Sequence, residues 1–77
     1  METLTLRLET QGRSGKKVTL VNGFTRRSEE LEEFAARIKK TCGTGGTVRG
    51  MSLEIQGDAR EKIRYLLTQW GFRVLGH

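Results

Sequence analysis

Apolar residues recur at every second position on both sides of a short basic stretch near the start of the chain. The alternation covers residues 3–9 and 17–22, and the stretch 11–17 that separates the two runs carries three positive charges and two glycines. Alternating runs joined by a short glycine-containing segment are typical of a β-hairpin in which each strand buries one face. We therefore expect a hairpin with these residues facing the core: Leu4, Leu6, Leu8, Val18 and Leu20.

Two later segments have apolar residues at the spacing of an α-helix. The first runs from Ser28, a favourable N-cap residue, to Cys42, and Gly43 follows as a residue that ends helices well. The second follows Asp58, which is expected to cap it together with Glu61 in a capping box. The apolar stripes are Leu31, Phe34, Ala35, Ile38 and Cys42 in the first helix, and Ala59, Ile63, Leu66, Leu67 and Trp70 in the second.

Further short strands are predicted at residues 47–49 and 53–56, and a last one at residues 72–74, so that the order of elements is β-β-α-β-β-α-β. Two amphipathic helices need a common apolar surface, which a sheet with one buried face provides. The sequence therefore predicts the α+β class, as a two-layer sandwich of one mostly antiparallel sheet with both helices packed on one face. With 77 residues, the chain is expected to form a single domain.

The basic and acidic residues of the chain are segregated along the sequence. The net charge is +5, and from Gln11 to Arg27 there are five basic residues and no acidic one. A segregated positive charge favours an acidic polymer as partner, with nucleic acid first. The candidate RNA-contacting residues are Arg13, Lys16, Lys17, Arg26 and Arg27.

The residues offer little for catalysis, metal binding or membrane insertion. Cys42 is the only cysteine and His77 the only histidine, and no set of side chains has the spacing of metal ligands. The glycines of residues 43–47 follow a helix instead of opening one, so they do not match a nucleotide-binding loop. No apolar run is long enough to span a bilayer, and the N-terminus lacks the pattern of a signal peptide. The sequence thus predicts a cytoplasmic protein without metal, cofactor or small-molecule substrate.

Two alternatives concern the basic stretch and the aromatic residues. The segment Gly12-Arg13-Ser14-Gly15 could cradle a phosphate in a small anion-activating enzyme, although no general base accompanies it. The second alternative is a platform of exposed rings on which bases stack, but the aromatic residues are mostly expected in or near the core: Phe34, Tyr65, Trp70 and Phe72. Recognition of a folded RNA by shape and backbone is therefore favoured over a platform of exposed stacking rings.

Four segments, in this order and at this separation, resemble the SUI domain family, which comprises eukaryotic translation initiation factor 1 and its short prokaryotic homologues. They are Gly15-Lys16-Lys17-Val18-Thr19, Gly43-Thr44-Gly45-Gly46-Thr47-Val48, Leu53-Glu54-Ile55-Gln56-Gly57-Asp58 and Trp70-Gly71-Phe72. The resemblance implies that residues 1–77 are one SUI-type domain with a basic hairpin loop at residues 11–17.

The resemblance also implies a function. Such a domain binds the small ribosomal subunit through rRNA near the initiator tRNA complex and influences start-codon selection, without being an enzyme. Arg13, Lys16 and Lys17 match the family's rRNA-facing loop, and a monomer is expected. The alternative is a general RNA-binding or stress-linked translation regulator that takes no part in routine initiation.

Overall fold

Five strands and two helices make up the described part of the computed structural model, which covers residues 3–11, 15–25 and 28–76. The strands are β1 (Thr3–Gln11), β2 (Lys16–Asn22), β3 (Gly46–Arg49), β4 (Ser52–Gln56) and β5 (Arg73–Gly76), and the helices are α1 (Ser28–Cys42) and α2 (Arg60–Gln69). The order of elements matches the one predicted from hydrophobic periodicity. Ser28 begins α1 as predicted, whereas its capping side chain lies outside the described part of the chain.

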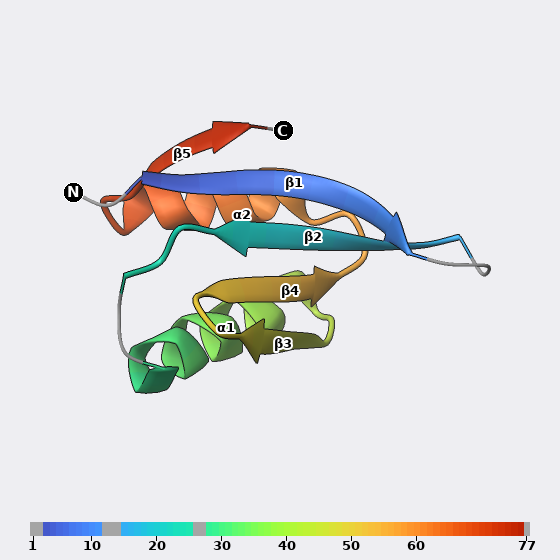
Figure 1. Ribbon diagram of the computed structural model, residues 1–77, viewed down its shortest axis with the longest axis horizontal. Helices are drawn as coiled ribbons and strands as arrows, with labels where there is room; N and C mark the ends of the chain where they lie inside the picture. Colours follow the sequence, from blue (N-terminus) through green and yellow to red (C-terminus); the bar gives the residue numbers. More distant parts are fainter. Residues whose placement is uncertain (1–2, 12–14, 26–27, 77) are drawn as a thin grey trace.

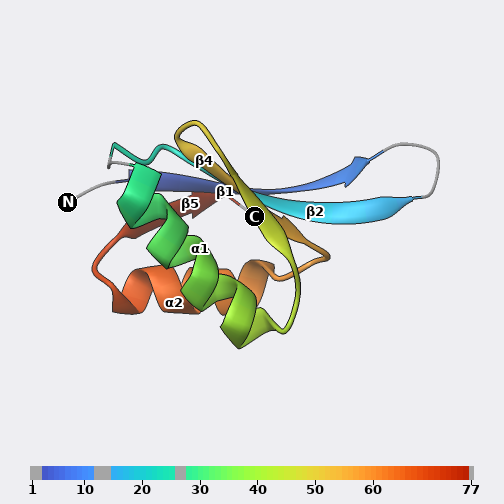
Figure 2. The same ribbon diagram turned by 90° about the horizontal axis from the view of Figure 1, so that it is seen from below.

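The strands form one sheet in the order β3-β4-β2-β1-β5. Neighbouring strands are antiparallel except for β1 and β5, which run parallel. Both helices lie on the same face of this sheet and leave the other face open (Figure 2). This arrangement confirms the predicted two-layer α+β fold with a mostly antiparallel sheet.

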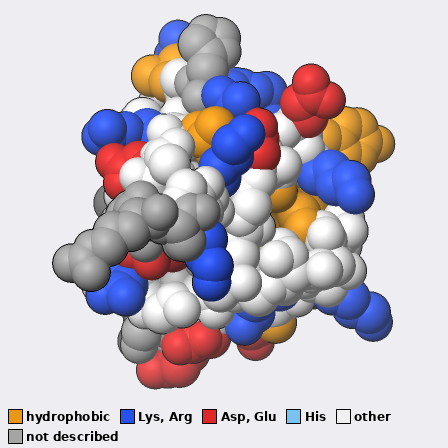
Figure 3. Space-filling model, turned by 90° about the vertical axis from the view of Figure 1, so that its right-hand side faces the viewer, with side chains coloured by type: hydrophobic (Ala, Val, Ile, Leu, Met, Phe, Trp, Pro, Cys, Tyr) orange, Lys and Arg blue, Asp and Glu red, His pale blue; other side chains and the backbone are white. Residues whose placement is uncertain are grey.

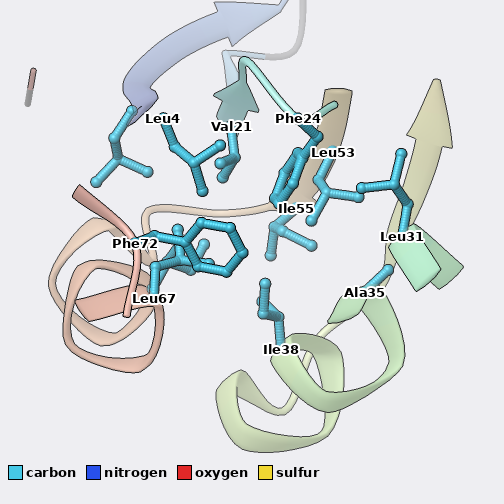
Figure 4. Close-up of a cluster of buried hydrophobic side chains, with 12 residues drawn as sticks. Leu4, Val21, Phe24, Leu31, Ala35, Ile38, Leu53, Ile55, Leu67 and Phe72 are labelled. Atoms are coloured by element: carbon cyan, nitrogen blue, oxygen red, sulfur yellow. The ribbon is translucent and has the colours of Figure 1, made fainter. Parts of the chain in front are cut away.

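The core lies between the sheet and the two helices, and residues of β1, β2, α1, β4 and α2 contribute to it (Figure 4). Its aromatic part joins Phe24 and Phe72 to the half-buried Phe34 and Trp70, with ring centroids of Phe34 and Trp70 5.2 Å apart. The buried residues of the cluster are Leu4, Leu6, Val21, Phe24, Leu31, Ala35, Ile38, Leu53, Ile55, Ile63, Leu67 and Phe72.

The face of β2 that turns to the helices differs from the prediction. Leu6 pairs with Val21 and Arg7 with Leu20, and residues paired directly across two antiparallel strands share a face. Val21 therefore faces the core, while Leu20 lies beside Arg7 on the open face, together with Val18, which is nevertheless buried there. The expectation that Val18 and Leu20 point inward was wrong. This strand has apolar residues at both odd and even positions, so the pattern alone does not tell which face of the strand meets the helices.

The hairpin of β1 and β2 is longer than predicted and projects beyond the helical layer (Figure 1). Its ladder continues to the pair Gln11 and Lys16, so only residues 12–15 separate the strands. Leu8 is half-buried, unlike the fully buried Leu4 and Leu6, because the sheet passes the end of the core at this point. The far end of the hairpin is therefore held by strand pairing and not by packing on the helices.

The start of α2 is held by a residue from a distant strand. The N-cap position is Ala59, and its N–H donates to Oγ1 of Thr19 at 3.0 Å. The carboxylate of Asp58 accepts instead from the guanidinium of Arg60, at 2.9 and 3.0 Å, and only distantly from the Arg60 N–H, at 3.4 Å. The predicted capping box at Asp58 is therefore replaced by a tertiary cap from Thr19.

Candidate nucleic-acid interface

The first two residues of β2 place two exposed lysines near the tip of the projecting hairpin. Lys16 pairs with Gln11 and Lys17 with Thr10, and successive strand residues point to opposite faces. Lys17 has the same parity as Thr19 and so points to the helix side of the sheet, whereas Lys16 points to the open side. The hairpin thus offers a cation on each of its two faces.

The other three candidate residues, Arg13, Arg26 and Arg27, lie outside the described part of the chain. The elements that flank the last two can be placed: β2 ends and α1 begins at the end of the molecule opposite the hairpin tip (Figure 1). Of the five candidates, the structure therefore positions Lys16 and Lys17, and it positions them together.

The two glycine-containing motifs of the sequence meet beside the start of β2, next to Lys17. The N–H of Gln56 donates to the carbonyl of Gly45 at 2.9 Å, and Oγ1 of Thr44 donates to the carbonyl of Gln56 at 3.3 Å. The next residue, Gly57, donates its N–H to the carbonyl of Lys17 at 2.7 Å. The loop after α1, the end of β4 and the hairpin are thereby joined, so the motifs brace the strand that carries the two lysines.

The carboxylate of Asp58 is close enough to β2 to be affected by the charge of Lys17. The pKa of Asp58 is lowered chiefly by the hydrogen bond from the Arg60 side chain, and the positive charge of Lys17 acts in the same direction. Asp58 therefore stays ionised at neutral pH and offsets part of the charge of its neighbours. Lys16 lies on the opposite face of the sheet from Lys17.

Basic residues of both helices lie at the helix ends that point toward the hairpin. The last turn of α1, with Lys39 and Lys40, and the first turns of α2 lie near the middle of the long axis of the molecule, and the hairpin projects beyond them (Figures 1 and 2). Lys and Arg side chains are distributed over the surface seen from there (Figure 3). A hollow of about 600 Å³ at the start of α2 is lined by Cys42, Asp58, Ala59, Arg60, Glu61, Lys62 and Arg64. The acidic first turn of α1, with Glu29 and Glu30, lies at the opposite end.

The thiol of Cys42 lines the same hollow but is poorly suited to act as a nucleophile. Burial raises its pKa, and the nearby charge of Lys62 opposes this only in part. A thiol whose pKa is raised stays protonated at neutral pH, and the thiolate is the reactive form. Cys42 is therefore a half-buried packing residue, a little more exposed than predicted.

Tyr65 is the residue whose exposure the sequence reasoning missed. Its relative exposure is 64%, whereas Phe72 is buried and Phe34 and Trp70 are half-buried against the core as predicted. The signal is present in the helical spacing, because Tyr65 falls outside the stripe of Ile63 and Leu67. The type of this residue suggests the core, but its phase along the helix places it on the surface.

Two further classes of site are absent from the described residues. None of the helices described here has the length and apolar character needed to cross a membrane. Within the same residues, no group of three or more His, Cys, Asp or Glu side chains is placed to hold a metal ion.

Comparison with known proteins identifies the family. The model of the family described as "Translation initiation factor SUI1" matches residues 1–73. The chain belongs to the SUI1 family. Its membership confirms the resemblance inferred from the four sequence motifs, and the motifs that meet beside the start of β2 are among the residues matched.

Relatives of this SUI1-family chain occur in bacteria and archaea. An uncharacterized protein of Haemophilus influenzae is 44% identical over 66 residues, which is 86% of this chain and 62% of that protein. The uncharacterized protein YciH of Escherichia coli is also 44% identical over 66 residues, covering 86% of this chain and 61% of YciH. The "Protein translation factor SUI1 homolog" of Sulfolobus acidocaldarius is 40% identical over 60 residues, covering 78% of this chain and 61% of that protein. The chain thus spans less than two thirds of the length of these relatives.

Proposed function

We propose that this SUI1-family chain acts in translation initiation, where it binds rRNA of the small ribosomal subunit and influences start-codon selection. The observation that carries the proposal is the hairpin, which projects beyond the helices and bears Lys16 and Lys17 on opposite faces. Membership of a family described as a translation initiation factor supports the same role. Arg13, Lys16 and Lys17 would form the principal contact, with Arg26 and Arg27 as further contacts.

The proposed mechanism is electrostatic positioning without chemistry. Lysine and arginine contacts to phosphate release counterions and fix the orientation of a protein on RNA. A hairpin that is narrow and charged on both faces can enter a groove between RNA segments and contact phosphates on each side. From that position the domain would bias how the initiator tRNA complex meets the start codon. In this proposal residues 1–77 act as one unit, as a monomer, in the cytoplasm.

The test is binding to purified small ribosomal subunits over a series of salt concentrations. We expect the double variant Lys16→Ala/Lys17→Ala to bind more weakly and its salt slope to be shallower by about two units, since each phosphate that a cation neutralises adds about 0.9 to the slope. Adding Arg13→Ala should lower the slope further by about one unit. Large subunits and bulk RNA serve as competitors.

A matched control removes the same charge from the other end of the sheet. Arg49 ends β3 and Arg73 begins β5, both exposed and away from the hairpin tip (Figure 1). The variant Arg49→Ala/Arg73→Ala should keep the salt slope of the unmodified protein. If the two double variants lose affinity equally, the hairpin has no special role and the proposal fails. If the unmodified protein binds bulk RNA as tightly as small subunits, the alternative of a general RNA-binding regulator is favoured.

A further inference from the structure

A second surface, on the helical layer, combines an exposed aromatic ring with an apolar hollow and a cation. The last turn of α1 and the middle of α2 lie side by side and enclose a shallow slot of about 340 Å³. We call it the interhelical slot; its lining residues are Thr41, Glu61, Lys62, Tyr65 and Leu66. The surface inside it is almost wholly apolar, and Leu66 and the exposed Tyr65 are among the residues that line it.

The charged groups around the interhelical slot are on balance positive. Lys62 and Glu61 line both the slot and the adjoining hollow at the start of α2, where Asp58, Arg60 and Arg64 also lie. Asp58 and Arg60 form an ion pair at 2.9 Å, which largely neutralises both. Of the remaining groups, Lys62 and Arg64 outweigh Glu61 by one charge. An apolar slot thus opens next to a small positive field.

This combination matches the two chemical halves of a nucleotide. An exposed ring beside an apolar floor accepts the face of a base, and base stacking on an aromatic side chain tolerates any sequence. The ammonium group of a lysine beside the slot suits the phosphate that follows the base. An apolar peptide anchor would fill the slot but would make no use of Lys62 and Arg64.

We propose that the interhelical slot holds one unpaired base of single-stranded RNA, stacked on Tyr65, with a flanking phosphate on Lys62. The inference rests on the proposed function in taking RNA as the partner, but it uses side chains of α1 and α2 and none of the hairpin. It adds a single-strand contact to a protein whose hairpin suits the backbone of folded RNA.

A spectroscopic test can use the fact that Tyr65 is the only tyrosine in the chain. Incorporating 3-fluorotyrosine gives a single fluorine NMR signal, which reports on this ring alone. Titration with a short single-stranded RNA should shift the signal in a saturable manner. A duplex of the same sequence should leave the signal unshifted at the same concentrations, because its bases are already stacked.

Binding of the same single-stranded RNA, followed by fluorescence anisotropy, separates stacking from other roles of the ring. Tyr65→Ala should weaken binding roughly tenfold, whereas Tyr65→Phe, which keeps the ring, should bind like the unmodified protein. Glu61→Gln should strengthen binding, because it removes the carboxylate nearest the proposed phosphate. Far-UV circular dichroism checks that the variants are folded, which the exposure of Tyr65 and Glu61 favours.

Two results would overturn the inference. The first is single-stranded RNA binding by Tyr65→Ala with unchanged affinity, and the second is an equal loss of affinity for Tyr65→Phe. If the first result is accompanied by a reduced affinity of Tyr65→Ala for intact small subunits, the slot is assigned to a ribosomal protein instead. The variant Lys16→Ala/Lys17→Ala, tested in parallel, distinguishes a failure of the hairpin proposal from a failure of the slot proposal. If this variant binds small subunits normally while Tyr65→Ala binds the single-stranded RNA more weakly, only the hairpin proposal fails.

Discussion

At the scale of single residues, Thr19 connects the hairpin to the second helix. Its side chain is fully buried in β2, and its hydroxyl donates to the carbonyl of Gly57 at 2.7 Å while accepting the N–H of Ala59 at 3.0 Å. A buried backbone group without a partner costs about 1–3 kcal/mol. Thr19 therefore satisfies the backbone where β4 turns into α2, next to the strand that carries Lys17.

We expect Thr19→Val to lower the free energy of unfolding by about 1–3 kcal/mol, because valine keeps the shape but removes the hydrogen-bond partner of two part-buried backbone groups. Denaturation by urea, read by circular dichroism, measures the change. Thr19→Ser, which keeps the hydroxyl and removes only a methyl group, is the control and should cost about 1 kcal/mol or less. A Thr19→Val protein as stable as the unmodified one would show that the hydroxyl bridge contributes nothing.

At the scale of elements, the glycines before β3 serve different purposes. Gly43 follows α1 with φ of 67°, which ends the helix as predicted. Gly46 begins β3 so close to β4 that an added Cβ would lie 2.7 Å from the carbonyl oxygen of Glu54 and from Cδ1 of Ile55. A Cβ on Gly45 would come no nearer than 3.5 Å to Gln56, an ordinary contact. One residue thus decides whether the edge strand can approach its neighbour.

The different surroundings of Gly45 and Gly46 predict different effects of the same substitution, glycine to alanine, on stability. Gly46→Ala should destabilise the protein by about 1–3 kcal/mol, because the new methyl group forces β3 away from β4. Gly45→Ala should change the stability by no more than about 0.5 kcal/mol. Thermal or urea unfolding of both variants measures this, and equal effects would contradict the close approach of β3 and β4 at Gly46.

At the scale of the whole molecule, basic and acidic residues are separated along the long axis. The protein measures 37 × 23 × 21 Å, and its long axis runs along the hairpin (Figure 1). Lys16 and Lys17 lie toward one end of this axis, the last turn of α1 with Lys39 and Lys40 lies near its middle, and the acidic start of α1 lies toward the other end. At physiological salt a charge is screened over about 8 Å, which is much shorter than the molecule. The two ends should therefore act independently on RNA.

The same screening predicts that variants at the two ends of α1 differ in their effect on RNA affinity near physiological salt. Lys39→Ala/Lys40→Ala should weaken binding to small subunits, and the difference from the unmodified protein should shrink as salt is raised. Glu29→Gln/Glu33→Gln, which changes as much charge on the first half of α1, should leave the affinity nearly unchanged. Equal and opposite effects of the two variants would mean that only net charge matters, and not its position along the molecule.

The sequence by itself determined the order of the elements, the two helices from their apolar stripes and the two-layer fold that these elements can form. These features depend on periodicity within short segments, which a sequence displays directly. The motifs that indicated the SUI1 family were equally local. The candidate lysines of the hairpin could also be named in advance, since charge and turn residues are read in one short stretch.

Only the tertiary structure decided which face of β2 is buried, because Val18, Leu20 and Val21 give that strand apolar residues at both parities. Pairing with β1 selected Val21 and placed Thr19 where α2 needs a hydrogen-bond partner. Burial and capping by distant residues are set by long-range pairing, and no local pattern in the sequence encodes them.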